Sequence, residues 1–443
     1  MAKIDRKMLP MAAEGEVRMK QVTAILIGAG NRGAEAYASY ALKYPGELSF
    51  VGVAEPREDR RREFALKHGI EDRYAVSDWK ELLAFPRLAD CVLICTQDQL
   101  HVEPMRRAME SGYDILCEKP VSPIKEELIE LKKETAAYPG LISVSHVLRY
   151  SPFFRKIKEI IDSKVLGELV NIQHMESVGW WHAAHSFVRG NWRNTEESCP
   201  MILAKCCHDF DILLWLVGKP CKAVSSFGSL KLFKEENAPA NSPSHCLEGC
   251  SHRDTCPFYA PRFYLENPQA PSGNLRRVVA IEDTDEALLK ALAKGPYGRC
   301  VYRCDNNVVD HQIVNMLFED DITVSLTMSA FTEHCQRNIT LQGSRGQITG
   351  CMEENKVVLT DFTSGNVTEF NLRVPPTGHS GSDTLLMRTF VEAVTEKLGG
   401  AGGTGKNCSN AIQAVESHLV ALAAEESRLA GGKLVIMDEF LRR

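Results

Sequence analysis

The sequence has no excess of basic residues and no long apolar run. Its 52 Lys and Arg are outnumbered by 58 Asp and Glu, which argues against sequence-independent nucleic-acid binding because such binding needs a basic face. No apolar run approaches the ~18–20 residues that span a bilayer, and residues 1–20 lack the apolar core of a secretory signal. We therefore expect a cytoplasmic protein with a small-molecule partner and no nucleic-acid or membrane partner.

Paired C-x-x-C motifs are also absent, although the chain has 15 cysteines. A cytoplasmic setting keeps cysteines as thiols or metal thiolates rather than disulfides. Four cysteines have spacings that suit a tetrahedral structural zinc site, which would fasten a polar segment without a core of its own. The expected ligands are Cys246, Cys250, Cys256 and Cys300, with Cys304 or His252 as substitutes. Unligated thiols and an iron–sulfur cluster remain as alternatives.

The order of apolar and charged segments divides the chain into two domains. From residue 21 to 148, continuous apolar runs alternate with amphipathic helices, which indicates an α/β domain with a parallel sheet covered on both faces. Residues 149–443 mix alternating strands with helices, which indicates an α+β domain with a cysteine-containing insertion at about 235–304. Residues 1–20 are predicted to form a tail.

Hydrophobic periodicity predicts the individual elements after the first domain. Helices are expected at 152–162, 201–217, 382–397 and 409–429. Strands are expected at 169–176, 308–317, 323–330 and 338–341.

A glycine-rich turn follows the first apolar run. The turn Gly28-x-Gly30-x-x-Gly33 stands between a strand and a helix, where the glycines allow a tight turn and a close approach of pyrophosphate. Glu55 ends the next apolar run, 22 residues after Gly33, and a carboxylate there accepts hydrogen bonds from ribose hydroxyls. The pattern predicts an NAD-binding Rossmann domain. NADP stays open because of three nearby arginines, Arg57, Arg60 and Arg61.

A second motif, Glu118-Lys119-Pro120, follows another apolar strand at the carboxyl edge of the predicted sheet, where open α/β sheets bind ligands. With this motif the chain resembles the Gfo/Idh/MocA family, typified by glucose–fructose oxidoreductase and inositol dehydrogenase. The matching features are the GAGNRG turn, Thr96 with His101, the EKP triplet, the segment His146…Arg149-Tyr150, and the helix from Lys205 to Leu216.

The resemblance implies a Rossmann domain followed by a domain with an open, mainly antiparallel sheet, which often forms the contact of a homo-oligomer, a dimer or tetramer. It implies that Lys119 lies beside the nicotinamide and the substrate hydroxyl, where a cation stabilises charge as hydride leaves. The expected cofactor-binding residues are those of the turn and the two loops: Gly28, Gly30, Asn31, Arg32, Gly33, Glu55, Thr96, His101, Glu118 and Lys119.

His208 matches the family's catalytic histidine, and an imidazole is the usual base for a hydroxyl proton at neutral pH. Many family members carry an aspartate four residues earlier, where this chain has Ala204, followed by Lys205. We expect Lys205 to share a helix face with His208, to lower the pKa of His208, and to contact a substrate oxygen or carboxylate itself. Asp211 lies one helical turn beyond His208.

The segment from Gly179 to Arg193 is dense in Trp, His and Arg. Sugar pockets combine apolar walls with a few polar groups, so this segment is expected to line the substrate side. A rigid aromatic connection packed on the sheet is the alternative. The full set of expected substrate-binding residues is His146, Arg149, Trp181, His182, His185, Arg189, Trp192, Asp211 and His379.

The sequence therefore predicts an NAD(P)-dependent oxidoreductase that moves hydride between the nicotinamide and a carbohydrate, cyclitol or related polyol. One alternative is a redox-neutral NAD-dependent glycosidase or lyase that oxidises the sugar transiently. A second is a nucleotide-sensing binding protein without turnover. Release of NADH separates the first hypothesis from the second.

Overall fold

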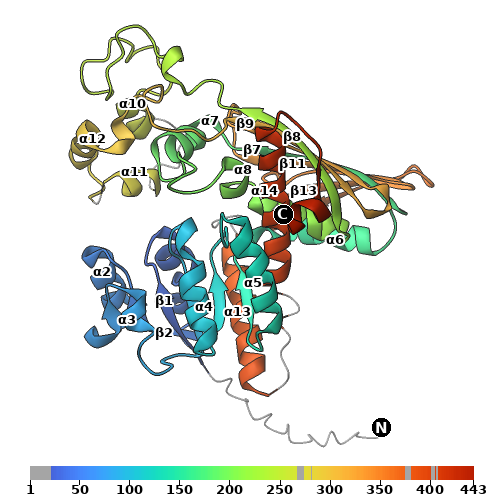
Figure 1. Ribbon diagram of the computed structural model, residues 1–443, viewed down its shortest axis with the longest axis horizontal. Coiled ribbons are helices and arrows are strands. Elements are labelled where there is room, and N and C mark those ends of the chain that lie inside the picture. The colour runs from blue at the N-terminus through green and yellow to red at the C-terminus, as the bar shows by residue number, and fades with distance from the viewer. Residues whose placement is uncertain (1–20, 267–273, 281, 375–380, 401–404, 406–407) are drawn as a thin grey trace, which may run out of the picture.

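The computed structural model describes residues 21–443 except 267–273, 281, 375–380, 401–404 and 406–407. Two sheets organise these residues, one below and one above in Figure 1. The predicted tail, residues 1–20, lies outside the described residues. None of the helices in the described part is long and apolar enough to cross a membrane.

The first sheet is wholly parallel and has the strand order β3-β2-β1-β4-β5-β6. Its order reverses between β1 and β4, which is where doubly wound sheets bind dinucleotides. The predicted Rossmann fold is confirmed. The strands are β1 Val22–Ile27, β2 Leu48–Ala54, β3 Ala75–Val76, β4 Cys91–Ile94, β5 Asp114–Cys117 and β6 Ile142–Val144. The helices include α2 Glu58–His68, α3 Trp79–Leu82, α4 Val102–Glu110 and α5 Lys125–Ala137.

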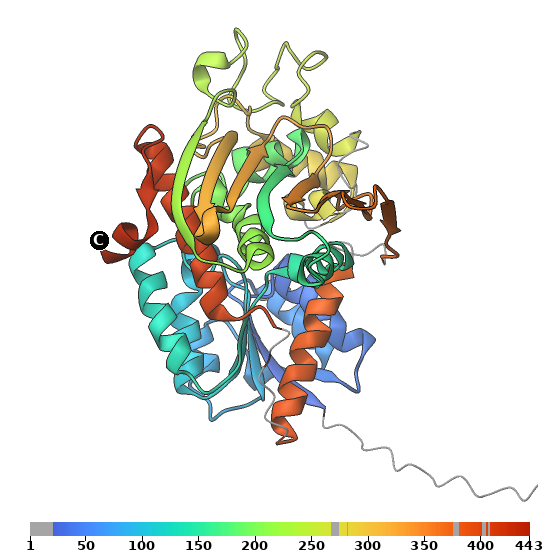
Figure 2. The ribbon, with the colours of Figure 1, turned by 90° about the vertical axis from the view of Figure 1, so that its right-hand side faces the viewer.

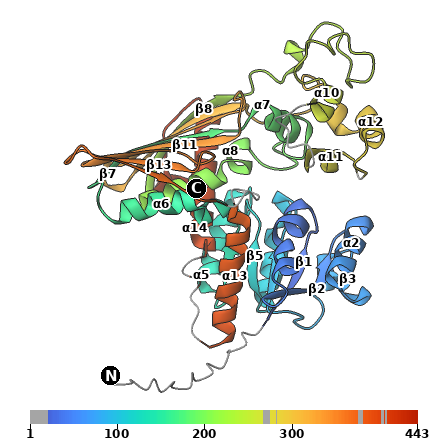
Figure 3. The same ribbon diagram turned by 180° about the vertical axis from the view of Figure 1, so that it is seen from behind.

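The second sheet has the order β14-β13-β12-β11-β7-β10-β9-β8-β15, and only β7 and β10 pair in parallel. This confirms the open, mainly antiparallel sheet. Helices α6 (Pro152–Asp162) and α14 (Ala411–Leu429) lie on the face turned toward the first sheet (Figures 1 and 3). The strands are β7 Leu169–Ser177, β8 Cys221–Ser229, β9 His311–Phe318, β10 Thr323–Ser329, β11 Gln336–Gly343, β12 Gly346–Cys351, β13 Lys356–Asp361, β14 Val367–Asn371 and β15 Val435–Ile436.

The predicted helix 201–217 is interrupted. The structure has α8 at Met201–Ala204 and α9 at Cys207–Val217, and the hydrogen bonds restart at the Cys206 carbonyl, which accepts from the amides of Asp209 and Phe210. Lys205 therefore lies in the break rather than on the α9 face that carries His208. Apolar periodicity runs across both helices, so it gave no sign of the break.

The insertion at 235–304 has its own small core, contrary to the expectation that it lacked one. Phe233, Phe258, Phe263 and Leu292 are buried in a cluster separate from the main core. The described part of the insertion includes the helices α10 Ala260–Leu265, α11 Asn274–Val279 and α12 Asp285–Lys294.

The C-terminal helices return to the first domain. Helix α14, Ala411–Leu429, packs against α5, and α13, Ser382–Leu398, packs along β1 and the segment 31–37. Figure 2 shows α13, in orange, beside the parallel sheet, whereas α14, in red, lies higher, where it contacts α5 and β8. The amide of Val144 donates to the carbonyl of Ser409 at 2.8 Å. Residues far beyond position 149 therefore help to build the carboxyl edge of the first sheet. The remaining helices are α1 Ser39–Lys43, α6 Pro152–Asp162, α7 Trp180–His182 and α15 Met437–Arg442.

Candidate functional site

The glycine turn has the geometry of a phosphate cradle. Gly28 has φ +92°, and a Cβ there would lie 2.5 Å from the Cys95 carbonyl oxygen. A Cβ on Gly33 would lie 2.2 Å from the Gly28 oxygen, whereas one on Gly30 would meet only an Arg60 nitrogen at 3.8 Å. Gly28 and Gly33 are thus required by packing, and Gly30 leaves room outside the turn. This arrangement fits a dinucleotide pyrophosphate.

Glu55 joins the end of β2 to this turn. One carboxylate oxygen accepts from the Ala29 amide at 2.8 Å and the other from the Arg57 amide at 3.0 Å. Of the three nearby arginines, Arg57 pairs with Asp59, and Arg61 donates to the Glu55 carbonyl. The buried carboxylate, with its remaining lone pairs, fits the hydroxyls of a ribose better than a 2′-phosphate.

Arg32 and Glu118, both expected to bind cofactor, bind each other. Arg32 Nε lies 2.9 Å from Glu118 Oε1, and Arg32 Nη2 lies 2.8 Å from Asp383 Oδ1 on α13. Tyr37 also donates to Glu118. Burial opposes ionisation of Glu118, but Arg32 and Lys119 outweigh it and lower its pKa to about 2. This cluster fastens the turn to the EKP loop and to α13.

Lys119 points at the start of the His208 segment. Its Nζ donates to the carbonyl of Ala204 at 3.0 Å. Burial acts to lower the pKa of Lys119, but Cys207, Glu118 and Asp98 outweigh burial, so its pKa is raised and the ammonium persists. The lysine therefore contacts the backbone of Ala204, the residue four positions before His208.

The loop residues Thr96 and His101 support the EKP turn. The His101 ring nitrogens lie 2.7 Å from the Pro120 carbonyl and 3.1 Å from the Thr96 carbonyl. Thr96 Oγ1 donates to the Leu100 carbonyl at 2.9 Å. The buried His101 ring thus holds two loops of the carboxyl edge together.

His208 lies in the first turn of α9 with 8% of its surface exposed. Its ring centroid is 5.6 Å from that of His146. Asp211, a turn further on, is held by Arg149 through contacts of 2.6 and 2.7 Å. The contact of Lys119 with Ala204 and the position of His208 four residues later bring the predicted cation and base to the same edge of the first sheet.

A buried ionic network surrounds Lys205, and sequence reasoning missed most of it. Lys205 Nζ lies 3.1 Å from Glu176 Oε1, while Arg337 contacts both Glu176 and Asp209 at 2.8 and 2.9 Å. Asp209 also contacts His174 at 2.8 Å. Glu176 and Arg337 occupy facing positions on β7 and β11. The sequence signal for this network was the presence of charged residues at strand positions whose side chains face the core.

The aromatic segment is more deeply packed than a pocket wall would need. His185 contacts the Tyr264 hydroxyl at 2.9 Å and stacks on Tyr297. Burial, followed by Arg189, lowers the pKa of His185 to about 4. Arg189 is fully buried and donates to the carbonyls of Arg299 and Phe258.

The remaining predicted substrate residues lie in varied surroundings. Trp181 stacks on His182, whose pKa is lowered by burial and by Lys205. Trp192 is 37% exposed and donates to Asp98 at 3.0 Å. His379 lies outside the described residues.

The predicted zinc site is not supported. Among the described residues, no group of three or more His, Cys, Asp and Glu side chains is arranged to hold a metal ion. The insertion instead contains a cluster of buried apolar side chains. The four expected ligands, Cys246, Cys250, Cys256 and Cys300, line one small cavity of about 10 Å³.

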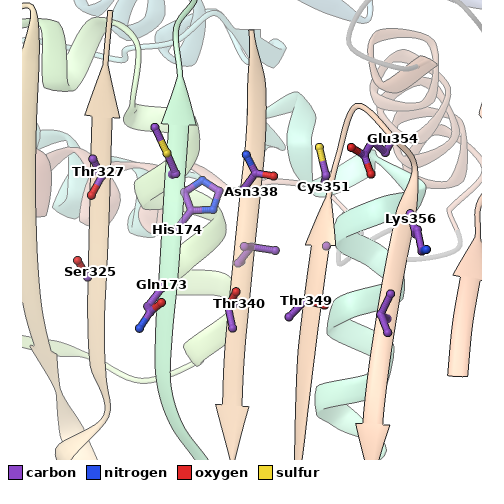
Figure 4. Close-up of a pocket in the computed structure, with 14 residues that line it drawn as sticks. Gln173, His174, Ser325, Thr327, Asn338, Thr340, Thr349, Cys351, Glu354 and Lys356 are labelled. Atoms are coloured by element: carbon purple, nitrogen blue, oxygen red, sulfur yellow. The ribbon is translucent and has the colours of Figure 1, made fainter. Parts of the chain in front are cut away.

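A hollow of about 650 Å³ lies on the second sheet, away from the glycine turn and Lys119. Figure 4 shows its polar side chains in rows on neighbouring strands. They include Gln173, Ser325, Thr327, Asn338, Thr340 and Thr349. Such a face does not resemble the enclosed, mainly apolar pockets that hold small molecules.

Comparison with known proteins agrees with this two-domain site. Residues 22–146 match the model "Oxidoreductase family, NAD-binding Rossmann fold", and residues 158–428 match "Oxidoreductase family, C-terminal alpha/beta domain". These matches define a two-domain oxidoreductase whose first domain is of the NAD-binding type. The chain belongs to the Gfo/Idh/MocA family.

Individual relatives are distant. Inositol 2-dehydrogenase 4 of Saccharopolyspora erythraea is 27% identical over 49% of this chain and 59% of its own. A 2,7-anhydro-N-acetylneuraminate hydratase of Escherichia coli is 24% identical over 33% of this chain and 39% of its own. Both matches cover less than two thirds of the relative's length. The crystal structure of an inositol dehydrogenase homologue from Azotobacter vinelandii, complexed with NADH and myo-inositol, has a TM-score of 0.65 at 16% identity, covering 95% of this chain and 98% of that one.

Proposed function

We propose that this chain is an NAD(H)-dependent dehydrogenase or reductase that acts on a CH–OH group of a carbohydrate, cyclitol or related polyol. The observation that carries the proposal is the contact of Lys119 Nζ with the Ala204 carbonyl, 3.0 Å away. This contact joins the carboxyl edge of the dinucleotide-binding sheet to the segment that bears His208. A cation and a base are thereby available on one substrate hydroxyl.

The residues of the turn fit NAD. The cradle at Gly30 takes the pyrophosphate, and Glu55 takes the ribose hydroxyls, which favours NAD over NADP because a carboxylate repels a 2′-phosphate. When bound, the nicotinamide accepts or donates the hydride. Arg32 and Glu118 act indirectly, since their ion pair shapes the loop that carries Lys119.

Lys119 and His208 have separate roles at the substrate hydroxyl: Lys119 acts on its oxygen and His208 on its proton. The Lys119 ammonium donates to the substrate oxygen and stabilises the negative charge that develops on it. His208 takes the hydroxyl proton during oxidation and returns it during reduction. Lys205, held by Glu176, donates a further hydrogen bond to a substrate oxygen.

The test is a panel of sugars, cyclitols and sugar acids with NAD or NADP, followed by the absorbance of the reduced nicotinamide. Lys119→Ala should keep cofactor binding and lose at least about 100-fold in turnover. Lys132→Ala is the matched control, because Lys132 forms a surface ion pair with Glu416. Unchanged turnover of Lys119→Ala would remove this lysine from the mechanism.

A redox-neutral reaction is the second candidate, because one matched relative is a hydratase. In that case the same two residues serve a transient oxidation, and the product retains the oxidation state of the substrate. Product formation without accumulation of NADH would favour this candidate over a dehydrogenase.

The open face of the second sheet fits a second copy of the chain. Polar side chains, among them Gln173, Thr327 and Thr340, line the hollow of this face, and Phe227 and Ile313 add exposed apolar surface. A homo-oligomer formed across this face would cover both regions. The solution mass measured by light scattering tests this proposal.

A further inference from the structure

Three histidines from distant parts of the chain lie in a row behind the candidate site. The ring of His146 is 5.6 Å from that of His208 and 5.4 Å from that of His418, centroid to centroid, and each pair is nearly perpendicular. His208 belongs to α9, His146 follows β6, and His418 belongs to α14. His208 is 8% exposed, whereas His146 and His418 are fully buried.

His146 is the unusual member of this row. It is fully buried, and neither of its ring nitrogens has a hydrogen-bond partner among the described residues. An unsatisfied buried polar atom costs about 1–3 kcal/mol, so a buried imidazole without partners needs an explanation. A phenylalanine would fill the same space without this cost.

The neighbours of His146 differ in what they can do with a proton. His418 uses both nitrogens, accepting from the Val121 amide at 3.0 Å and contacting the Ala414 carbonyl. On another side, His146 Nε2 lies 3.9 Å from Asp211 Oδ1. Asp211 is therefore the available acceptor beyond His146.

Asp211 is connected through Arg149 to an exposed residue. Its carboxylate is held by Arg149, and Arg149 also donates to the exposed side chain of Gln413. Burial raises the pKa of Asp211 although Arg149 opposes the shift. The carboxylate is thus more basic than an ordinary aspartate. Asp211 is itself fully buried, and its partner Arg149, with 10% of its side chain exposed, is the group between it and solvent.

We propose that His146 relays the substrate proton from His208 to the Asp211–Arg149 pair. This inference rests on the proposed dehydrogenase function. During oxidation the substrate carbon gives a hydride to NAD⁺ and the hydroxyl gives its proton to His208. His146 accepts that proton on one nitrogen and releases the proton of its other nitrogen to Asp211, from which it passes to water. The net products are a carbonyl compound, NADH and H⁺.

The charges around His146 favour a relay in which the two proton transfers are coupled. Burial, then Arg149 and Lys119, lower the pKa of His146 well below its ordinary value, although Glu118 opposes the shift. Lys119 and Glu118 come from the EKP loop, Arg149 from the segment after β6, and Asp211 from α9. Forming a charged imidazolium at His146 is therefore costly. The ring stays neutral if one nitrogen gains a proton at the same time as the other nitrogen loses one.

The experiment compares the unaltered protein with His146→Phe and His146→Gln. Phe keeps the ring volume without nitrogens, and Gln keeps hydrogen-bonding atoms without an imidazole. We expect both to bind NAD⁺ and to lose about 10- to 100-fold in turnover, with an altered solvent isotope effect and pH profile. In His146→Ala, added imidazole should restore part of the loss. His68→Phe is the matched control, because His68 packs on Phe50 and Phe64 away from the site.

Two outcomes overturn the relay: wild-type turnover and pH profile in His146→Phe, or full activity in His146→Gln. The first excludes any need for the nitrogens, and the second shows that hydrogen bonding without proton transfer is sufficient. NADH formation by the unaltered protein tests the proposed function separately. If no substrate yields NADH, the proposed function and the relay both fail.

Discussion

The ammonium of Lys205 forms an ion pair with the carboxylate of Glu176, 3.1 Å away, and the other oxygen of Glu176 contacts Arg337 at 2.8 Å. Glu176 is almost wholly buried beneath both cations. Its charge therefore compensates Lys205, which can donate a hydrogen bond without presenting an unbalanced positive charge.

Glu176→Gln should strongly destabilise the protein. Removing one partner from a buried ion pair leaves an uncompensated charge and costs about 3–5 kcal/mol, here with two cations affected. Urea denaturation measures the change. Glu416→Gln is the control, because its partner Lys132 is 40% exposed and surface pairs contribute about 0–1 kcal/mol. Equal losses in the two variants would contradict this account.

The two glycines of the cradle should respond differently to alanine. Gly33→Ala puts a methyl group 2.2 Å from the Gly28 carbonyl oxygen, so we expect about 1–3 kcal/mol of destabilisation with weaker NAD binding. Gly30→Ala meets no backbone atom within 4 Å and should lose NAD binding while its melting temperature is retained. NAD titration and thermal melting measure both effects. Tight NAD binding by Gly30→Ala would exclude the proposed pyrophosphate position.

Acid should destabilise the protein between pH 7 and pH 5. Burial lowers the pKa of His418 to about 3 and that of His185 to about 4, both below the ~6.5 of an unfolded histidine. The unfolded chain therefore binds more protons in this range, and stability falls as the pH decreases through 6.5. Linkage gives a loss of about 2 kcal/mol per histidine between these pH values.

Urea denaturation of His418→Leu at pH 7 and pH 5 isolates one of these contributions. The variant should be less stable at pH 7, because the Val121 amide loses its acceptor. Its further loss at pH 5 should be about 2 kcal/mol smaller than that of the unaltered protein. An identical pH dependence would show that His418 does not titrate in this way.

A substitution in the apolar core of the insertion should destabilise the insertion without affecting the first domain. Leu292 is fully buried in the cluster of the insertion, so Leu292→Ala should cost about 2–5 kcal/mol. We expect faster proteolysis within 235–304, with NAD binding retained. Leu429→Ala is the control, because Leu429 is 71% exposed. Unchanged proteolysis would indicate that something other than apolar packing holds the insertion.

A bulky charge on the open sheet face should disrupt a homo-oligomer. Thr340→Arg lies in the row of small polar side chains in Figure 4, where a second copy would have to pack closely. We expect light scattering to give a smaller mass for this variant than for the unaltered protein. Thr255→Arg, on the exposed surface of the insertion, should leave the mass unchanged. A monomeric unaltered protein would exclude the proposed contact.

The fold of the first domain could be predicted from short sequence patterns. The glycine turn, the acid at the end of β2 and the apolar strands are determined within short segments, and the structure forms a parallel sheet from them. Helix α6 agrees with its prediction because Ser151 caps it and Pro152 begins it. The expected strands of the second domain were also found, because a sheet with one buried face gives each strand a local alternation of apolar and polar residues.

The sequence alone determined the family, the dinucleotide turn and the residue types available for catalysis. Tertiary structure decided which of them meet: Glu176 with Lys205, and His146 between His208 and His418. It also decided that the helix breaks at Lys205 and that the insertion has an apolar core. Such contacts join residues far apart in the chain, and no local periodicity records them, because their energies arise only after distant elements pack.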